Sequence, residues 1–503
     1  MSTAFAMHRA SRRATDQGIA LPTVLGVLMV VTILVIAGFM LTQQSLFEAN
    51  KVNSESQAFE AANSTLDAAV ARIQHQGFKA GVDFPMHLTG SQTGSGDATV
   101  TVQQVSNNEY LLVSTGLGRD KQQVTVTVRM YFIDLYGMNV SYGARLNGGS
   151  AGKINGTTSI YGPLYTFGSL DSSNIPGGAG GYYWGPLMVK GGDVVDPGGA
   201  IDVGSIYYEP PHTVTSGANP QPKLIPSVPD FQVPPVDAAY LNAALARSIS
   251  ESSDNNQGEP AVRPGVTNTE VATKGNPATY AHVRASGATS AYKVIDNNIV
   301  IDKSSTGLTI TSATPAFGTA TDDFAWNPST HTLTVWGTVF IDGPLTTDDM
   351  IKYVGNGIIV ANGPITLNQG MVPLHGLLPG KGGKDGLTTY DNQSFSGDET
   401  LGFVSPDKIL IDRSGNNDKG EAVPPTHAGA FYCVNPNGLD PNLGMIQLGT
   451  KVVAVGSVIA RGIDFVGNNN QHLRTSANLG QTVSTQMPGY GQMVQSFGTW
   501  SRK

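Results

Sequence analysis

The sequence contains a few residue groupings that resemble chemical motifs, but none stands in the context its chemistry needs. Gly148-Gly149-Ser150-Ala151-Gly152 fits the Gly-x-Ser-x-Gly pattern of serine hydrolases, in which the serine stands between a strand and a helix. Lys153-Ile154-Asn155-Gly156 follows it and predicts a strand and a turn instead. Gly380-Lys381-Gly382-Gly383-Lys384 lacks the spacing and the Ser or Thr of a phosphate-binding loop. We interpret the first as a chance match and the second as a solvated loop.

The groupings that might bind a metal ion are equally incomplete. A set of oxygen-bearing side chains lies within ten residues, as in a calcium loop, but its spacing is not that of an EF-hand and two cations intrude: Asp412, Asn416, Asp418 and Glu421, with Arg413 and Lys419. The nine histidines are scattered, without a zinc-binding spacing. The paired carboxylates Asp322-Asp323 and Asp348-Asp349 stand beside turn-like sequence. We therefore expect no catalytic residue, no metal, no cofactor and no enzymatic activity.

The composition favours a turn-rich β protein of two to four structural units. Of the 503 residues, 61 are glycine and 29 proline, and charged residues make up 14%, against roughly 25% in a typical soluble protein. The net charge of −8 is spread along the chain, which argues against nucleic acid as a partner. Because Cys433 is the single cysteine, no intramolecular disulfide can form, and burial and strand pairing must stabilise the fold.

The N-terminal region contains the strongest signal in the sequence. No charged side chain occurs from Ile19 to Phe47, a run of 29 residues that is roughly 43 Å long as a helix, against ~30 Å for a bilayer core. Three arginines precede it (Arg9, Arg12 and Arg13), so the positive-inside rule puts residues 1–18 in the cytoplasm and the rest outside. A secretory signal peptide is the competing interpretation, but its apolar region is about half this length and ends at a small-residue cleavage site.

Two segments of this region resemble a known family. Gln17-Gly18-Ile19-Ala20-Leu21-Pro22-Thr23-Val24-Leu25 resembles a type IV prepilin cleavage site of the PilX kind, and Gln57-Ala58-Phe59-Glu60-Ala61-Ala62 resembles the end of the same N-terminal module. The resemblance covers about residues 17–73. It implies cleavage between Gly18 and Ile19 by a prepilin peptidase, N-methylation of Ile19, and assembly with other pilins.

The sequence departs from the major pilins at the fifth residue of the mature chain. Major pilins carry a glutamate there, and this chain has Thr23, as the resemblance to PilX-type and tip subunits would imply. An uncharged residue avoids burying a carboxylate in hydrocarbon but removes the partner of a neighbour's terminal amine. We therefore expect a minor or tip-proximal subunit. The alternative is that Thr23 faces lipid in a permanent anchor.

Beyond the membrane the helix is expected to continue to about Gln76 and to pack on a sheet. A narrow apolar stripe recurs at spacings of three and four: Phe59, Ala62, Leu66, Ala69 and Ile73. Three strands follow, at residues 98–102, 110–114 and 124–128, with turns at 107–108 and 116–121. We expect an antiparallel meander whose valines (Val100, Val102, Val124, Val126 and Val128) cover the stripe; Phe59, Leu66 and Ile73 are the predicted assembly residues besides Thr23.

The remainder is expected to be β-rich, with a short repeat. Glycine, five residues and a second glycine, often followed by Pro and an aliphatic residue, occur at 156–164, 337–345 and 357–365, more loosely at 456–462, and as a fragment at 185–189. The copies at 337 and 357 are 20 residues apart, close to one coil of a β-solenoid. A β-sandwich with similar strands is the alternative. The aromatics Trp184, Tyr207 and Tyr208 are expected to pack in a β core.

A Pro-rich polar segment, residues 209–265, separates two β segments and is expected to be a linker with one helix at 238–248, capped by Asp237. The fold class expected is α+β, a long pilin helix and an antiparallel sheet followed by a large all-β extension. The boundaries expected are a leader (1–18), the helix (19–77), the sheet (78–138), a first β segment (139–208), the linker (209–265) and a second β domain (266–503).

These features predict a non-enzymatic minor pilin-like subunit, held in the cell membrane by one helix before it enters a pilus and displays its β domain outside the cell. Its expected partners are other pilins or pilus assembly proteins, the prepilin peptidase and the membrane, with an unknown surface ligand. Two alternatives stay open. One is a single-pass surface adhesin or binding protein, and the other is a β-helix enzyme that acts on polysaccharides.

Overall fold

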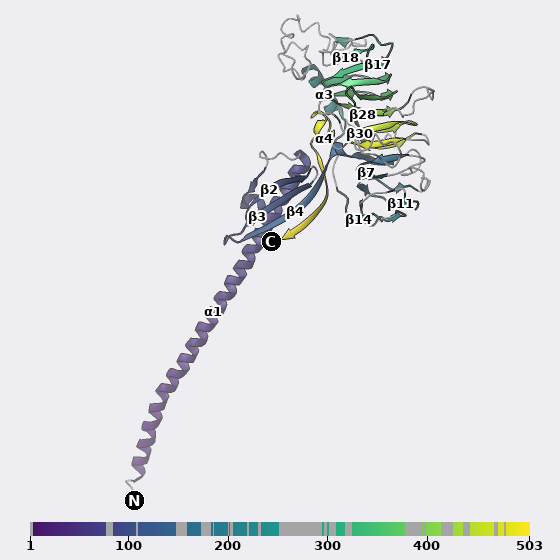
Figure 1. The fold of residues 1–503 in the computed structure, drawn as a ribbon. Coiled ribbons are helices and arrows are strands. Elements are labelled where there is room, and N and C mark those ends of the chain that lie inside the picture. The colour runs from purple at the N-terminus through teal and green to yellow at the C-terminus, as the bar shows by residue number, and fades with distance from the viewer. Residues whose placement is uncertain are drawn as a thin grey trace. The chain divides into compact units, whose positions relative to one another are not determined.

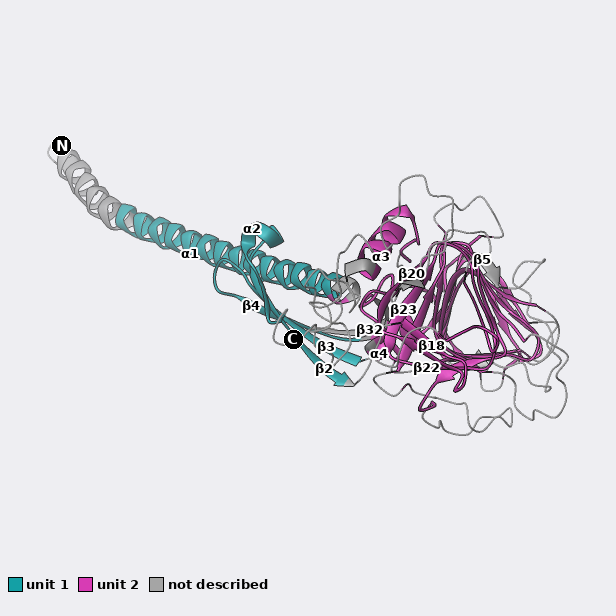
Figure 2. Ribbon diagram, turned by 90° about the horizontal axis from the view of Figure 1, so that it is seen from above, with its two compact units in different colours: residues 1–72, 78–130, 498–503 teal, residues 73–77, 131–497 magenta. Residues whose placement is uncertain are grey.

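The computed structural model describes residues 4–76, 84–106, 109–146, 158–172, 183–184, 186–199, 201, 205–218, 221–229, 233–250, 294–295, 299–300, 308–316, 324–377, 395, 399–413, 426–435, 443–466, 471–476 and 479–502. The fold class is α+β, with one long N-terminal helix and a large majority of strands (Figure 1). The chain divides into two compact units (Figure 2). Unit 1 comprises residues 1–72, 78–130 and 498–503, and unit 2 comprises residues 73–77 and 131–497.

Helix α1 (Ala4–Gln76) ends where the sequence predicts and begins earlier. The sequence predicts a start at Ile19, whereas the helix of the full chain already includes residues 4–18. Residues 4–18 contain neither proline nor glycine before Gly18, so nothing in them interrupts a helix. Pro22 consequently lies inside the helix of the full chain and would return to a first turn, where a missing N–H costs nothing, only after removal of 1–18.

The predicted meander is confirmed as part of a five-stranded sheet in the order β1-β2-β3-β4-β32. Its strands are β1 (Met86–Leu88), β2 (Asp97–Ser106), β3 (Glu109–Leu117), β4 (Gln123–Asp134) and β32 (Met493–Arg502), and a short helix, α2 (Gly90–Thr93), precedes β2. The strand β32 comes from the far end of the chain and lies next to β4. Nearly all of unit 2 is therefore an insertion between two neighbouring strands of this sheet, which the sequence did not predict.

The strands of unit 2 form parallel ladders that surround one core (Figure 2). The first ladder runs in the order β20 (Gly337–Ile341), β23 (Asn356–Ala361), β26 (Thr400–Val404), β28 (Thr426–Cys433), β30 (Val453–Phe465), β5 (Asn139–Leu146), β7 (Leu164–Phe167), β10 (Leu187–Lys190), β12 (Ser205–Tyr208) and β14 (Lys223–Ile225).

Two further ladders complete the arrangement. The second contains β17 (Leu308–Thr311), β21 (Leu345–Asp348), β24 (Ile365–Asn368), β27 (Lys408–Ile411), β29 (Met445–Leu448) and the end of β30. The third contains β19 (Thr332–Val335), β22 (Ile351–Val354), β25 (Met371–Pro373), the beginnings of β28 and β30, β31 (His472–Thr475), β6 (Ser159–Tyr161) and β9 (Tyr183–Trp184).

Smaller elements extend these ladders. A separate parallel sheet has the order β13 (Val214–Ser216), β11 (Val194–Asp196), β8 (Leu170–Asp171). The strand β18 (Phe324–Asn327) pairs antiparallel with β19, and β15 (Val294–Ile295) pairs antiparallel with β16 (Ile299–Val300). The helical elements of unit 2 are η1 (Leu135–Gly137), α3 (Ala238–Ser250) and α4 (Leu479–Thr482).

The 20-residue spacing corresponds to one step along the ladders. Gly337 pairs with Gly357 and Leu345 with Ile365, so the two repeat copies stack in register. The Gly-Pro pairs lie between strands of two ladders, and each proline carbonyl accepts an amide hydrogen bond from a residue of a neighbouring strand. The proline carbonyls of 344 and 364 accept from Leu308 and Leu345, at 2.9 and 3.0 Å. A proline suits this position because it can accept but not donate.

The other Gly-Pro pairs lie at a different corner. Pro163 and Pro186 stand between the third ladder and the first, where their carbonyls accept from Asn139 (2.9 Å) and Leu164 (3.1 Å). Pro344 and Pro364 stand between the first ladder and the second. The copies at 156 and 185 are therefore not equivalent to those at 337 and 357. The copy at 456–462 lies within the single strand β30, in register with Gly429 of β28.

The two β segments are contiguous in space although the predicted linker separates them in sequence. β5 of the first segment pairs in parallel with β30 of the second, and β6 pairs with β31. The pair formed by β5 and β30 thus lies in the middle of the first ladder. The strands on one side of it come from residues 139–225, and those on the other side come from residues 308–476. Pairing between strands more than 300 residues apart leaves no local pattern, so the sequence alone indicated two separate segments.

The segment predicted as a linker, 209–265, begins instead with two strands, β13 and β14. Its described residues 228–229 and 233–245 cover the outer face of the first ladder. Outward-facing tyrosines of that ladder donate to proline carbonyls of the segment: Tyr165 to Pro229 at 3.1 Å, and Tyr432 to Pro234. The amide of Tyr240 donates to Asp237 Oδ1 at 2.8 Å, which confirms the predicted cap of α3. This segment, with η1 and α4, buries a second apolar cluster that includes Tyr165, Tyr207 and Tyr432. Tyr207 is therefore a core residue, as predicted.

Two ionisable residues are buried in unit 2 with opposite consequences. His427 of β28 is in register with Met371 and Ala454 of the inner core, and burial lowers its pKa from 6.5 to about 4. Asp134 lies beside η1, where Oδ1 accepts from the Tyr136 amide at 2.7 Å, and burial raises its pKa from 3.8 to about 6. The histidine is thus held neutral and the carboxyl is held protonated around pH 5.

These shifts predict opposing effects of pH on stability. As pH rises from about 4 to about 6, the folded state binds more protons than the unfolded state at Asp134 and fewer at His427. The contribution of Asp134 to the free energy of unfolding therefore falls by about 3 kcal/mol over this range, and that of His427 rises by about 3 kcal/mol. The two contributions nearly cancel. Between pH 4 and pH 6, the free energy of unfolding of Asp134→Asn should therefore rise by about 3 kcal/mol relative to that of the wild-type chain. That of His427→Met should fall by about as much relative to the wild type.

The measurement is guanidinium unfolding of the full-length chain in detergent at pH 4, 5 and 6. The readout is the change with pH of the difference between variant and wild type, because this cancels the contributions of all other groups. A difference that stays constant with pH in either variant would contradict the assignment for that residue.

Candidate functional site: the N-terminal helix and its attachment to the sheet

The first half of α1 is an apolar surface that unit 1 leaves uncovered. Every described large apolar side chain from Val24 to Phe47 is at least half exposed: Val24, Leu25, Val27, Leu28, Met29, Val30, Val31, Ile33, Leu34, Val35, Ile36, Phe39, Met40, Leu41, Leu46 and Phe47. Contiguous apolar patches of this extent on a protein surface mark contacts with membrane or protein. Among the described residues, α1 is the one helix with the length and composition to cross a membrane.

The polar groups within this apolar stretch are satisfied inside the helix. The hydroxyl of Thr32 donates to the Leu28 carbonyl at 2.7 Å, and that of Thr42 donates to the Gly38 carbonyl at 2.8 Å. A hydroxyl that bonds one turn back adds no unsatisfied donor to an apolar environment. Neither threonine therefore opposes placement of residues 24–42 in hydrocarbon.

Near Ser54 the helix changes from exposed to buried. One face of its second half is buried and, within unit 1, consists mostly of small residues: Ser54, Ala58, Ala61, Ala62, Thr65, Leu66, Ala69 and Val70. On the sheet, Val100 is in register with Ser114, and the buried residues include Val100, Leu112, Val124, Val126 and Val128. The residues of the predicted stripe and of the predicted valine face are buried, except for Phe59 and Val102, which are half-buried.

Small residues let the helix backbone approach β3 closely. A Cβ at Gly116 would overlap the Ala58 carbonyl oxygen and lie 2.8 Å from the Ala62 nitrogen. A Cβ at Gly118, just beyond β3, would overlap the Ser54 carbonyl oxygen. The sequence analysis assigned residues 116–121 to a turn, but β3 continues through Gly116, where glycine allows close approach to the helix.

Hydrogen bonds fix the helix and β3 in register. The Ser114 hydroxyl donates to the Ala62 carbonyl at 2.7 Å in a buried position. The amide of Asp120, in the turn after β3, donates to Ser54 Oγ at 3.1 Å. Together with the glycine contacts, these bonds define the helix–strand seam, formed by Ser54, Ala58 and Ala62 on α1 and by Ser114, Gly116 and Gly118 on the strand side.

The structure places the predicted site residues in two groups. Gly18, Ile19 and Thr23 lie in the helical backbone of α1, and their side chains lie outside the described part. Leu66 and Ile73 are fully buried, whereas Phe59 is half-buried. Of the seam residues, the sequence analysis placed only Ala62 in the packing face of the helix. The spacing of Ser54, Ala58, Ala61, Ala62 and Thr65 was a usable signal, because small residues at three and four mark close helix packing.

The described residues do not bring the sequence motifs that resemble chemical sites into an arrangement that could carry out their chemistry. Residues 148–152 and 380–384 lie outside the described residues, as do the calcium-loop candidates Asn416, Asp418 and Glu421. Asp412 Oδ1 accepts from the Arg413 amide at 2.7 Å, and Asp349 Oδ2 lies 2.6 Å from His331 Nδ1. Within the described part of the chain, no cluster of three or more His, Cys, Asp or Glu side chains is arranged to hold a metal ion.

Comparison with known proteins adds no assignment, since no family model, curated protein or solved structure matches the chain.

The seam predicts a strong dependence of unit 1 on Gly116. In Gly116→Ala, the new methyl group overlaps the helix backbone, which cannot yield as a flexible side chain can. We expect a loss of about 1–3 kcal/mol or more, since overpacking of a fixed core costs that much. The measurement is thermal unfolding of the full-length chain in detergent, followed by protease susceptibility of α1 beyond Phe47.

Gly90→Ala is the matched control, because a Cβ at Gly90 meets its nearest atom, Asp97 Oδ1, at an ordinary 3.7 Å. Equal stability of the two variants would show that α1 does not depend on close approach to β3.

Proposed function

We propose that the chain is a minor pilin-like structural subunit, held in the membrane by α1 before assembly into a type IV pilus or related filament. The observation that carries this proposal is the division of α1 into an uncovered apolar half and a half attached to an antiparallel sheet. An anchor alone needs the first half, whereas a subunit that leaves the bilayer must also hold its helix rigidly to the exported part. The helix–strand seam supplies such an attachment.

The processing step follows from the cleavage-site resemblance. Cleavage between Gly18 and Ile19 on the cytoplasmic side removes the arginine-bearing leader, and methylation of Ile19 follows. With the charged leader removed, the apolar half of α1 can exchange lipid for the helices of other pilins. The uncharged Thr23 in place of a glutamate favours a minor or tip-proximal position, and the N-terminus starts in the cytoplasm with the rest of the chain outside.

The β extension is proposed to be a β-solenoid displayed on the outside. Parallel ladders in register, a 20-residue step between Gly337 and Gly357, and Gly-Pro corners all support this interpretation. The extension is inserted between β4 and β32, so both of its connections arise from neighbouring strands of one sheet. Such an insertion can present a surface ligand site without interrupting α1 or the meander.

Processing gives the decisive test of this function. In cells that contain a prepilin peptidase, the mature chain should begin at Ile19, with a methylated amine; in cells without the peptidase it should keep residues 1–18. Gly18→Val should block cleavage, because the peptidase site resembles one that requires glycine there. The measurement is intact mass with N-terminal sequencing of the membrane fraction.

Gly26→Val is the matched control. It introduces the same side chain into the same helix, at a site where a Cβ meets no atom within 4 Å, and it should be processed normally. A mature chain cut near residue 47, or an uncut chain in the presence of the peptidase, would reject the pilin assignment and favour a secreted or permanently anchored β protein.

A further inference from the structure

The last strand of the sheet in unit 1 comes from a distant part of the chain. β4 ends at Asp134 and β32 begins at Met493, and all of the residues between them belong to unit 2. The free-energy cost of bringing the two ends of an unfolded segment together rises with the length of the segment. An unfolded unit 2 therefore opposes the pairing of β32 with β4, and this pairing needs the ends of unit 2 to be held together.

The two ends of unit 2 are joined by direct contacts. The amide of Leu135, the residue after β4, donates to the carbonyl of Gln492, the residue before β32, at 3.0 Å. The hydroxyl of Tyr136, a fully buried residue, donates to the Pro488 carbonyl at 2.5 Å. We call these contacts the clasp, formed by Leu135 and Tyr136 of η1 on one side and by Pro488, Gly489 and Gln492 on the other.

Glycines let the two sides approach each other closely. Gly489 has a φ of +72°, and a Cβ there would lie 2.8 Å from Leu135 Cδ2. Next to the clasp, a Cβ at Gly480 of α4 would lie 2.2 Å from Asp134 Oδ1. Both places have room for a hydrogen atom but not for a methyl group.

The C-terminal side of the clasp is fixed to the body of unit 2. The side-chain amide of Asn356, in β23 of the first ladder, donates to the Thr482 carbonyl at 2.8 Å. The hydroxyl of Tyr240, in α3, donates to the Gln486 carbonyl at 3.1 Å. Because these anchors belong to the first ladder and its cover, the C-terminal side of the clasp is in place only after both have formed.

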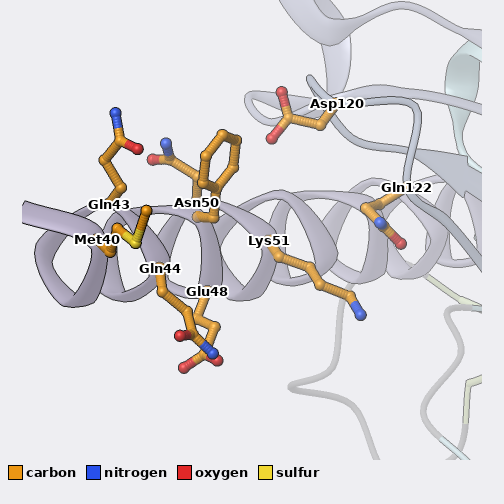
Figure 3. Close-up of a pocket in the computed structure, with 9 residues that line it drawn as sticks. Met40, Gln43, Gln44, Glu48, Asn50, Lys51, Asp120 and Gln122 are labelled. Atoms are coloured by element: carbon orange, nitrogen blue, oxygen red, sulfur yellow. The ribbon is translucent and has the colours of Figure 1, made fainter. Parts of the chain in front are cut away.

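The start of β4, in contrast, is held by unit 1 alone. Asp120 and Gln122, in the turn between β3 and β4, line one groove together with residues of α1 (Figure 3). The Asp120 amide also donates to Ser54 Oγ at 3.1 Å. The meander of β2, β3 and β4 can therefore attach to α1 without unit 2, whereas β32 reaches β4 through the clasp.

We propose that the clasp makes completion of the sheet in unit 1 conditional on the folding of unit 2, so that β32 pairs with β4 only in chains whose ladders have formed. Until then β4 has an unpaired edge, which is a template for pairing with another chain. A complete sheet thus distinguishes chains with a folded extension from those without one. The coupling goes beyond the proposed function and does not depend on it, since it would serve an anchored adhesin equally well.

Hydrogen exchange of the full-length chain in detergent, followed by mass spectrometry, tests the clasp. Tyr136→Phe removes the donor to Pro488, and Gly489→Ala places a methyl group against Leu135. In each variant we expect the amides of β32 to exchange about tenfold faster than in the wild type, the effect of losing one buried hydrogen bond. The amides of β26 and β28, in the first ladder, should keep their wild-type protection.

Two matched controls separate the clasp from general effects of these substitutions. Gly191→Ala introduces the same methyl group at a φ of +69°, where a Cβ meets no atom within 4 Å, and so reproduces the backbone strain of Gly489→Ala without its contact. Tyr165→Phe removes an equivalent hydrogen bond, to the Pro229 carbonyl, outside the clasp. Wild-type exchange of β32 in both clasp variants, or equal acceleration in the controls, would overturn the proposal.

A guanidinium titration of the wild-type chain tests the order of events directly. If β32 depends on unit 2, its amides should lose protection at the same guanidinium concentration as those of β26 and β28, or at a lower one. Protection of β32 that persists after β26 and β28 have lost theirs would refute the coupling. Either result leaves the pilin assignment untouched, because that assignment is tested by processing at Gly18.

Discussion

The close approach of α1 to β3 is the contact on which the rest of unit 1 depends. Gly116 and Gly118 bring the strand against the helix backbone, and Ser54, Ala58 and Ala62 leave room for it on the other side. Backbone atoms of α1 and β3 gain dispersion energy here only because no side chain lies between them. A larger residue at any of these positions would separate the two backbones. The seam therefore determines how far along α1 the sheet reaches. It leaves the apolar half of the helix, before Ser54, uncovered by the sheet.

That uncovered half sets the requirements for function. A helix with apolar side chains all round needs hydrocarbon or other apolar helices, and nothing in unit 1 covers residues 24–47. Both environments agree with a subunit that resides first in a bilayer and later in a filament core.

Unit 2 obeys a different constraint, the stacking of parallel strands in register. Its inner core contains mostly aliphatic side chains in columns, such as Ile351, Met371 and Ala454 on the third ladder. His427 within this core and Asp134 beside η1 show what burial does to ionisable groups, since around pH 5 each is held in its uncharged form. A second apolar cluster lies on the outer face of the first ladder, and the tyrosine–proline hydrogen bonds hold residues 228–229 and 233–244 over it.

The sequence by itself determined the elements whose pattern is local. The uncharged run of residues 19–47, the alternation in β2 and β4, the Asp237 cap and the 20-residue step between Gly337 and Gly357 each depend on residues close together in the chain. The extension of β3 through Gly116 and the different corners marked by Pro163 and Pro344 were not determined in this way, because each depends on what lies opposite. The start of α1 at Ala4 was missed although its reason is local, since residues 4–17 contain no proline or glycine.

Only the tertiary structure decided which distant segments meet. β32 beside β4, β5 beside β30, and the Asp120 turn against Ser54 join residues separated by tens to hundreds of positions. Parallel pairing is specified by the register of whole strands and by the cores they enclose, so a single strand carries no mark of its partner. Gly116 is a similar case. In the sequence it indicated a turn, but in the fold it lies in β3 and allows the strand to approach the helix closely.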